Sequence, residues 1–178
     1  MVVVNSFKEK KEANLMGLGL PKTFTLDNYI QIFEGGGIVR AFFNGLIQAG
    51  SSTFIVLVVG SLAAFVIARS RNKIISNLYY VFLLGLVVPI AYIPTYLVLD
   101  ILGLMNTHFG YVCVHATYGL PLAIFLYTAA VKGIPRELDE AAMIDGSSCW
   151  YLYRKIIFPL LRTTTATLFI FNFMGVWN

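Results

Sequence analysis

The sequence predicts an all-α, polytopic membrane protein. Hydrophobic residues make up 58% of its 178 positions and charged residues only 12%, whereas a soluble domain is usually about half apolar and a quarter charged. Three long apolar stretches contain no Asp, Glu, Lys or Arg. A soluble fold of this size would have to hide far too much apolar surface, so lipid is the expected solvent for much of the chain.

The apolar stretches have the length of membrane-spanning helices, which need about 20 residues to cross the hydrocarbon core. They run from Leu46 to Ala68, from Leu78 to Leu99 and from Phe109 to Val131. A fourth stretch, residues 163–178, is too short to span the membrane by itself. We therefore expect three complete spans and the start of another.

The distribution of charge between the spans predicts their orientation. Basic residues gather after the first and third spans, at Arg69, Arg71 and Lys73, and at Lys132, Arg136, Arg154, Lys155 and Arg162. Asp100 is the one charged residue between the second and third spans. Because basic loops stay in the cytoplasm, residues 69–77 and 132–162 are expected inside and residues 100–108 outside.

The same alternation divides the chain into two parts. Residues 1–43 are expected to be an extracytoplasmic segment that leads into the first helix, and residues 44–178 are expected to form the membrane domain. Three lysines between residues 8 and 11 are unusual for an external N-terminus. We therefore expect one more span before Met1, and the chain to be a fragment truncated at both ends.

Small residues and prolines within the spans predict close packing and bending. Small residues recur at four-residue spacing at Gly60, Ala64 and Ala68, which lets helix backbones approach closely in a membrane. Prolines interrupt the second and third spans at Pro89, Pro94 and Pro121, and each removes a backbone hydrogen bond and favours a kink. Such helices suit a protein that changes shape, and they suit a static bundle equally well.

The segment from Ile134 to Pro159 carries helix signals of its own, and we expect two short helices within residues 135–158. Pro135 suits the first helical position, and acidic residues follow it at Glu137, Asp139 and Glu140, where they favour the positive end of the helix dipole. Gly146 is placed as a C-terminal cap. A serine at 147 or 148 can begin the second helix, and Pro159 is expected to end it.

Each of these two helices has a face that could contact a partner. Leu138, Ala141, Ala142 and Asp145 share a face of the first helix, where the two small alanines allow close approach; Trp150, Tyr153 and Ile157 share a face of the second. From this pattern alone, the segment is either a docking surface or a hairpin packed only on its own chain.

The order of residues in this segment resembles the EAA motif of the permeases of binding-protein-dependent ABC importers. The matching residues are Glu140, Ala141, Ala142, Gly146, Ile156 and Pro159. The family normally ends the motif with Leu-Pro, and this chain has Phe158-Pro159, a departure that keeps the apolar character. The resemblance implies a coupling helix that docks in a cleft of an ATP-binding cassette ATPase. It assigns that interface to Glu140, Ala141, Ala142, Asp145, Gly146 and Pro159.

Other stretches are similar to the maltose-type carbohydrate branch of the same family: residues 5–8, 20–29, 145–148 and 156–160. The implied fold is the helical bundle of an ABC type I importer transmembrane domain, with six spans in the full subunit. The implied partners are ATP-binding cassette ATPase subunits, a second permease subunit and an extracytoplasmic substrate-binding protein. The implied solute is a sugar or oligosaccharide, and the location is the cytoplasmic membrane.

The remaining residues point to no catalytic or cofactor chemistry of the chain's own. His108 and His115 lack Cys, His, Asp or Glu partners at ligand spacing, so packing or pore lining is expected rather than metal binding. The sequence has no G-x-x-x-x-G-K-[ST] phosphate loop, so a separate subunit is expected to hydrolyse ATP. No Lys/Arg run is dense enough to suggest nucleic acid, and Cys113 and Cys149 are expected to be free thiols.

Three rival functions remain at this point. A permease for another solute class would share every feature above. A passive channel or scaffold would not need the pattern around Glu140 and Gly146. A membrane-embedded enzyme would need ionisable residues inside the spans, where the sequence has only His115. Several tyrosines in and between the spans could stack on sugar rings, or they could anchor the helices at the membrane interface.

Overall fold

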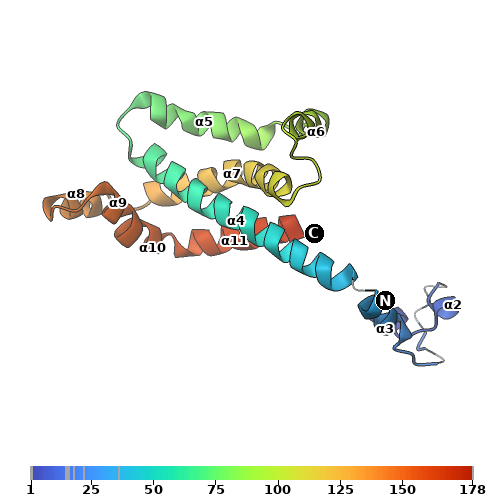
Figure 1. Cartoon of the computed structure of the whole chain (residues 1–178). Helices are drawn as coiled ribbons and strands as arrows, with labels where there is room; N and C mark the ends of the chain where they lie inside the picture. The colour runs from blue at the N-terminus through green and yellow to red at the C-terminus, as the bar shows by residue number, and fades with distance from the viewer. Residues whose placement is uncertain (1, 15–16, 18, 22, 36, 178) are drawn as a thin grey trace. The chain divides into compact units, whose positions relative to one another are not determined.

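The computed structural model describes residues 2–14, 17, 19–21, 23–35 and 37–177 of the chain (Figure 1). Among these residues all regular structure is helical, with no strand, which confirms the all-α fold class. The chain divides into two compact units, Met1–Leu46 and Ile47–Asn178. Each unit is described separately.

The first unit is a small assembly of short helices: α1 (Val2–Ser6), α2 (Lys10–Ala13) and α3 (Asp27–Glu34). The Nδ2 of Asn28, on α3, donates to the carbonyls of Ser6 at 3.1 Å and Lys8 at 2.8 Å. The rings of Phe7 and Phe24 stack with their centroids 4.7 Å apart. The segment after α1 is therefore fastened to the segment that contains α3.

Two long helices of the chain, α4 (Gly37–Arg69) and α7 (His108–Lys132), are long and apolar enough to cross a membrane. The second unit contains α4 from Ile47 onward. Helix α4 begins before the apolar stretch predicted from Leu46, because the charge of Arg40 ends an apolar run without ending a helix. Gly60, Ala64 and Ala68 are all buried, so the predicted stripe of small residues faces the interior of the unit.

The second predicted span is a broken helix. Its two parts, α5 (Lys73–Val87) and α6 (Tyr92–Ile101), meet at an angle of 110°. Val88 is extended, with φ −70° and ψ 123°, because the ring of Pro89 disfavours the helical region for the residue before it. Pro94 causes no further break, since it lies in the first turn of α6, where an N–H has no helical acceptor. One proline thus accounts for the break and the other is accommodated.

Pro121 does not break its helix, and α7 continues through it. The ring of Pro121 lies against Gly85 of α5, where an added Cβ would be 3.1 Å from the proline Cγ. Glycine at residue 85 therefore leaves the room that the Pro121 ring occupies between α5 and α7.

After α7 the chain forms a hairpin of short helices, which we call the connecting hairpin (residues 137–160). It comprises α8 (Glu137–Ile144), α9 (Cys149–Tyr151), the π-helical segment η1 (Leu152–Ile157) and α10 (Phe158–Leu160). The prediction that Pro159 ends the second helix is wrong, because the helix continues to Leu160. A proline ring clashes with the carbonyl four residues back in a regular α-helix, and the wider π-helical turn before Pro159 replaces that arrangement.

The last helix, α11 (Arg162–Trp177), follows α10 at a bend of 75°. If α5 with α6, and the helices Cys149–Leu160 with α11, are each counted as one bent span, the described residues contain up to four candidate spans. Their number and order in a membrane stay predictions.

Side-chain contacts fix the relative direction of α4 and α7 within the second unit. At one end Arg69 donates to the carbonyl of Ile134 at 3.1 Å. At the other end Gln48 Nε2 lies 2.9 Å from His108 Nδ1. The two helices are therefore parallel, and the basic segments 69–77 and 132–162 lie at the same end of the unit (Figure 1).

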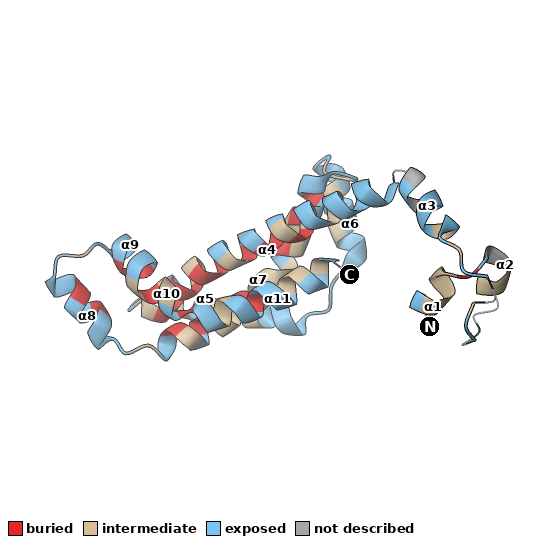
Figure 2. Cartoon of the chain, turned by 90° about the horizontal axis from the view of Figure 1, so that it is seen from below, coloured by how far each residue is buried: buried red, intermediate tan, exposed pale blue. Residues whose placement is uncertain are grey.

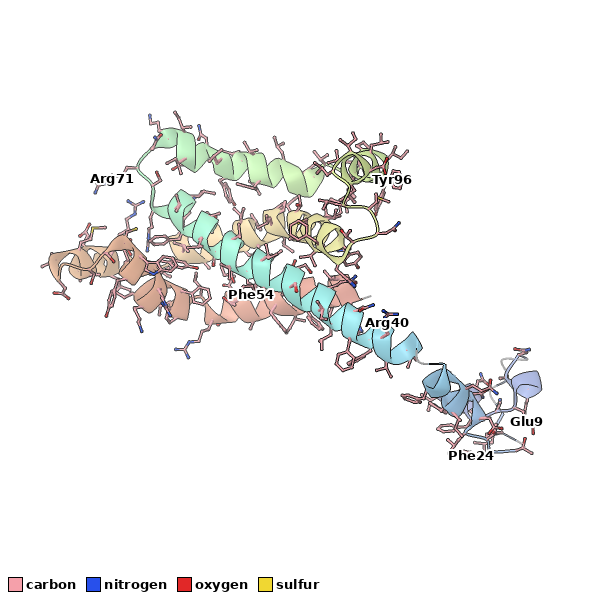
Figure 3. The ribbon with its side chains drawn as sticks, in the orientation of Figure 1. Glu9, Phe24, Arg40, Phe54, Arg71 and Tyr96 are labelled. Atoms are coloured by element: carbon pink, nitrogen blue, oxygen red, sulfur yellow. The ribbon has the colours of Figure 1, made fainter. Side chains whose placement is uncertain are left out.

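The core of the second unit lies between α4, α7, the connecting hairpin and α11. Its large members are Phe65, Tyr127, Val131, Leu152, Tyr153, Ile157, Leu161 and Leu168. Figure 2 shows buried residues along α4 and within the hairpin. By contrast, none of the residues of α5 and α6 is buried, and the structure describes all of them. Exposed aromatic side chains such as Phe54 on α4 and Tyr96 on α6 point outward (Figure 3).

Candidate functional site

The turn of the connecting hairpin is held by a glycine-dependent pattern of backbone hydrogen bonds. Gly146 has φ +74°, as predicted for a residue that caps a helix and reverses the chain. Its N–H donates to the carbonyl of Met143 at 3.0 Å, and the N–H of Ser147 donates to that of Ala142 at 3.0 Å. These two bonds form a Schellman motif, which satisfies the last carbonyls of α8.

The start of the second arm is capped as expected. Ser148 is extended, and its Oγ accepts a hydrogen bond from the N–H of Tyr151 at 3.2 Å. Such a cap satisfies one of the free donors at a helix start. The two helices of the hairpin are thus separated by a turn with defined backbone geometry, not by a slack loop.

Helix α8 has one face against its own chain and one face in the open. Asp139 and Ala142, one turn apart, are buried at 8% and 5% exposure. Glu140 and Ala141 lie between them in sequence and are exposed, because successive residues point about 100° apart around a helix. Ile144 is 86% exposed. The outward face therefore combines a carboxylate, a small residue and an apolar residue.

The residues that the sequence assigned to an interface are divided between these two environments. Glu140, Ala141, Asp145 and Gly146 are exposed on α8 and its turn. Ala142 belongs to the hydrophobic core of the chain, and Pro159 is half-buried in α10. A partner that docks on this hairpin could therefore touch the first four directly, whereas Ala142 holds α8 against its own chain.

The inward face of α8 is fastened to α4 by an ion pair. Arg69 Nε lies 2.7 Å from Asp139 Oδ2, with both side chains 12% exposed. This Nε contact is a close approach of opposite charges and not an aligned hydrogen bond. The second guanidinium nitrogen, Nη2, donates to Asp139 Oδ1 at 3.3 Å and to the carbonyl of Ile134 at 3.1 Å.

Sequence reasoning missed the role of this pair. It interpreted Arg69 as a topology signal and Asp139 as an acid that favours a helix start. The two residues are 70 positions apart, and nothing in either local pattern identifies the other as a partner. The one available signal was that Arg69 directly follows a charge-free span and has no acidic residue in its own loop.

The second arm of the hairpin is also anchored on α4. The Tyr153 hydroxyl lies 2.7 Å from Ser61 Oγ in a buried hydrogen bond. The Tyr153 ring lies 5.4 Å from that of Phe65, centroid to centroid. Of the predicted face of this arm, Tyr153 and Ile157 are buried, whereas Trp150 is 58% exposed. Both arms are therefore bonded to α4, at positions two helical turns apart.

A cleft of about 350 Å³ opens between the end of α4, α8 and α9. Its walls are apolar at Phe65, Val66, Met143 and Leu152, and they are charged at Arg69, Arg71, Arg136, Asp139 and Glu140. Arg71 lies on the connection between α4 and α5 and is exposed (Figure 3). Together with the outward face of α8, this mixture of apolar and charged side chains is typical of a protein–protein docking surface.

The two histidines lie in packing contacts. His108 meets Gln48 at the start of α7, and the His115 ring lies 4.2 Å from that of Tyr111. The part of the chain that the structure describes contains no group of three or more His, Cys, Asp or Glu residues that could hold a metal ion. Cys113 and Cys149 are both free thiols.

Several known proteins are similar to this chain in sequence or in fold. A family model described as "Binding-protein-dependent transport system inner membrane component" matches residues 56–178. The chain is 37% identical, over 180 residues, to the probable starch degradation products transport system permease protein AmyC of Thermoanaerobacterium thermosulfurigenes. It is 36% identical, over 183 residues, to the multiple sugar-binding transport system permease protein MsmG of Streptococcus mutans.

Both alignments cover 100% of this chain and 65% of the relative, so the chain spans less than two thirds of either relative's length. A crystal structure of a bacterial ABC transporter involved in the import of alginate superposes with a TM-score of 0.88. That match covers 99% of this chain and 63% of the other at 18% identity, and it supports the fold of an ABC importer membrane subunit.

Proposed function

Because this chain belongs to the family of binding-protein-dependent transport system inner membrane components, we propose that it forms part of the permease subunit of an ATP-driven importer. It is a multi-pass protein of the cell membrane. The activity proposed for the whole subunit is the movement of a solute through the membrane by alternating access, in which the helices expose the solute path first to one side and then to the other.

The observation that carries this proposal is the outward face of α8. Glu140 and Ala141 are exposed on a helix whose other side is fixed by Asp139 and Ala142. The exposed face lies next to a cleft that combines apolar and charged walls, which offers a partner both apolar contact and charge pairing. We propose that this face and the turn at Gly146 dock into an ATP-binding cassette ATPase.

The proposed mechanism needs a rigid contact between the ATPase and the spans. Closure of the ATPase dimer on ATP would push the hairpin, and the bonds of the hairpin to α4 would carry that displacement into the membrane. Glu140, Ala141, Asp145 and Gly146 would form the contact surface, and Ala142 and Pro159 would support it from within. ATP hydrolysis itself would take place in the partner ATPase.

The substrate proposed is a sugar or oligosaccharide. The names of AmyC and MsmG refer to starch degradation products and to multiple sugars, and this supports the carbohydrate class for the present chain without identifying a compound. A second permease subunit and an extracytoplasmic substrate-binding protein are proposed to complete the importer.

Reconstitution tests this proposal directly. The full-length subunit, the ATPase, the second permease and the binding protein are placed in proteoliposomes, and ATP hydrolysis and uptake of labelled maltodextrins, amino acids and phosphate are measured. We expect hydrolysis to rise with a carbohydrate and the carbohydrate to accumulate. A subunit that retains no ATPase, or that passes solute at the same rate without ATP, would instead be a scaffold or passive channel. Uptake of only amino acids or phosphate would contradict the substrate class.

A further inference from the structure

Arg69 joins three groups of the segment that follows α7. One guanidinium contacts both carboxylate oxygens of Asp139 and the carbonyl of Ile134. Ile134 lies in the loop that leaves α7, and Asp139 lies in the first turns of α8. The last residue of α4 therefore fixes both the entrance to the hairpin and the start of its first helix.

The geometry of the pair also fixes how α8 is rotated about its axis. Asp139 points inward to Arg69, so Glu140 and Ala141 must point outward, because each residue advances about 100° around the helix. A buried carboxylate is unfavourable without a partner charge. Rotation of α8 that moved Asp139 away from Arg69 would therefore lower the stability of the fold. The orientation of the exposed face is thereby tied to α4.

The second arm of the hairpin does not fix the orientation of α8. The bond between Tyr153 and Ser61 holds η1 against α4, but η1 and α8 are separated by the turn at Gly146. Ala142, the other buried residue of α8, is a small apolar residue, and an apolar contact has no preferred direction. Among the described residues, the ion pair of Asp139 with Arg69 is thus the directional side-chain contact between α8 and α4.

We infer that Arg69 and Asp139 form a latch that sets the orientation of the docking face of α8 and makes α4 the span that first receives the motion of the ATPase. This inference rests on the proposed function. It assigns the two residues a positioning role: Asp139 and Arg69 face the interior of the chain and act on the partner through Glu140 and Ala141.

The test uses the complete reconstituted importer and an exchange of the two charges. Arg69→Ala and Asp139→Asn each break the pair, and the double variant Arg69→Asp with Asp139→Arg restores it in reverse. Lys73→Ala, which removes an exposed basic residue at the start of α5, is the matched control. The measured quantities are the amount of ATPase retained by the subunit and the number of solute molecules imported per ATP hydrolysed.

We expect both single variants to retain the ATPase and to lose about tenfold in solute imported per ATP, a typical size for coupling between two sites. The exchange should recover at least part of this loss, whereas Lys73→Ala should match the wild type. Single variants with unchanged coupling would overturn the latch. So would an exchange variant no better than the single variants when all are equally abundant in the membrane.

If a single variant fails to accumulate, Arg69→Lys is measured in its place. It keeps the charge but cannot contact both Asp139 oxygens and the Ile134 carbonyl with one planar group, so an intermediate loss supports the latch and an unchanged ratio contradicts it. Failure of the proposed function would be seen separately, as a wild-type subunit that retains no ATPase or imports nothing.

Discussion

Gly60 of α4 and Ala123 of α7 face each other where the two helices approach closely. A Cβ added at Gly60 would lie 2.9 Å from the Cβ of Ala123 and 3.8 Å from Cδ2 of Tyr127. Gly60 and Ala123 are both buried. In a membrane, where apolar contact with lipid competes with apolar contact between helices, such close backbone approach is a main source of helix association.

Substitution of Gly60 by leucine should therefore separate α4 from α7. We expect a loss of about 1 to 3 kcal/mol of stability, as for overpacked cores, seen as a lower melting temperature of the detergent-solubilised full-length subunit. Gly50→Ala is the matched control, because it lies on the same helix and an added Cβ there meets nothing within 4 Å. Equal melting temperatures for the two variants would contradict the close packing of α4 and α7.

Gly119 of α7 is covered by Asn172 of α11. An added Cβ at residue 119 would collide with Asn172 Oδ1 and would lie 2.9 Å from Cγ2 of Val56. Gly119→Ala should lower the melting temperature, and Asn172→Ala in the same chain should recover part of the loss by making room. Gly175→Ala, with nothing within 4 Å, should change little. If the double variant is no more stable than Gly119→Ala, Asn172 is not the obstacle.

Substitutions of Gly146 test whether the backbone conformation of the hairpin turn matters for function. An added Cβ meets nothing within 4 Å, but the positive φ resists a side chain, at about 1 to 2 kcal/mol. We expect Gly146→Val to insert in the membrane yet to lose most solute-stimulated ATP hydrolysis, because the docking helix ends in the wrong place. Gly146→Asn should retain more activity, since asparagine tolerates positive φ.

A positional control separates strain at the turn from strain in general. Gly103 also has positive φ and open space around it, but it lies in the connection between α6 and α7 and not in the hairpin. Gly103→Val should keep solute-stimulated hydrolysis close to that of the wild type at equal abundance. If Gly146→Val also keeps it, the hairpin is an ordinary surface loop.

The two alanines of the EAA-like sequence should differ when each is changed to aspartate. Ala141 is exposed, so Ala141→Asp should leave the subunit folded and abundant and should impair its binding to the ATPase. Ala142 is 5% exposed, so Ala142→Asp buries an unpaired charge and should lower the amount of subunit in the membrane. An immunoblot of membranes, paired with copurification of the ATPase, checks both expectations. Equal behaviour of the two variants would contradict the orientation of α8.

The predicted topology can be measured with native and introduced cysteines. Cys149 is exposed and is expected in the cytoplasm, so in a Cys113→Ser chain an impermeant thiol reagent should label it only after the cells are opened. Leu102→Cys, at a residue 62% exposed between α6 and α7, should be labelled in intact cells when Cys149 is replaced by serine. The reverse pattern would invert the assignment of inside and outside.

The fold was predictable where a single local property determines it. The lack of charge from Leu46 to Ala68 and from Phe109 to Val131 predicted helices of membrane length because a span has to satisfy its own backbone hydrogen bonds. Gly146 was predictable for the same kind of reason, since glycine is the residue that takes a positive φ at a helix end at little cost.

Other features depend on contacts that no local pattern contains. Pro89 predicted a kink, but an angle of 110° depends on how α6 packs after the break. The π-helical turn from Leu152 to Ile157 has no compositional signal of its own, and its absence from the prediction is why Pro159 was expected to stop the helix. The pairing of Arg69 with Asp139 required knowledge of the tertiary structure.

The break between α5 and α6 determines what can surround this part of the subunit. Helix α5 has 15 residues, which is about 22 Å of helix, less than the roughly 30 Å of a bilayer core. The exposed, non-helical residues Pro89 and Ile90 are therefore expected within the depth of the bilayer. Hydrocarbon offers no hydrogen bonds to such carbonyls, so fatty acyl chains are poor neighbours there. The surface of the subunit at this point is therefore expected to face water or to be covered by protein, which makes it an expected boundary between the lipid phase and the interior of the proposed importer.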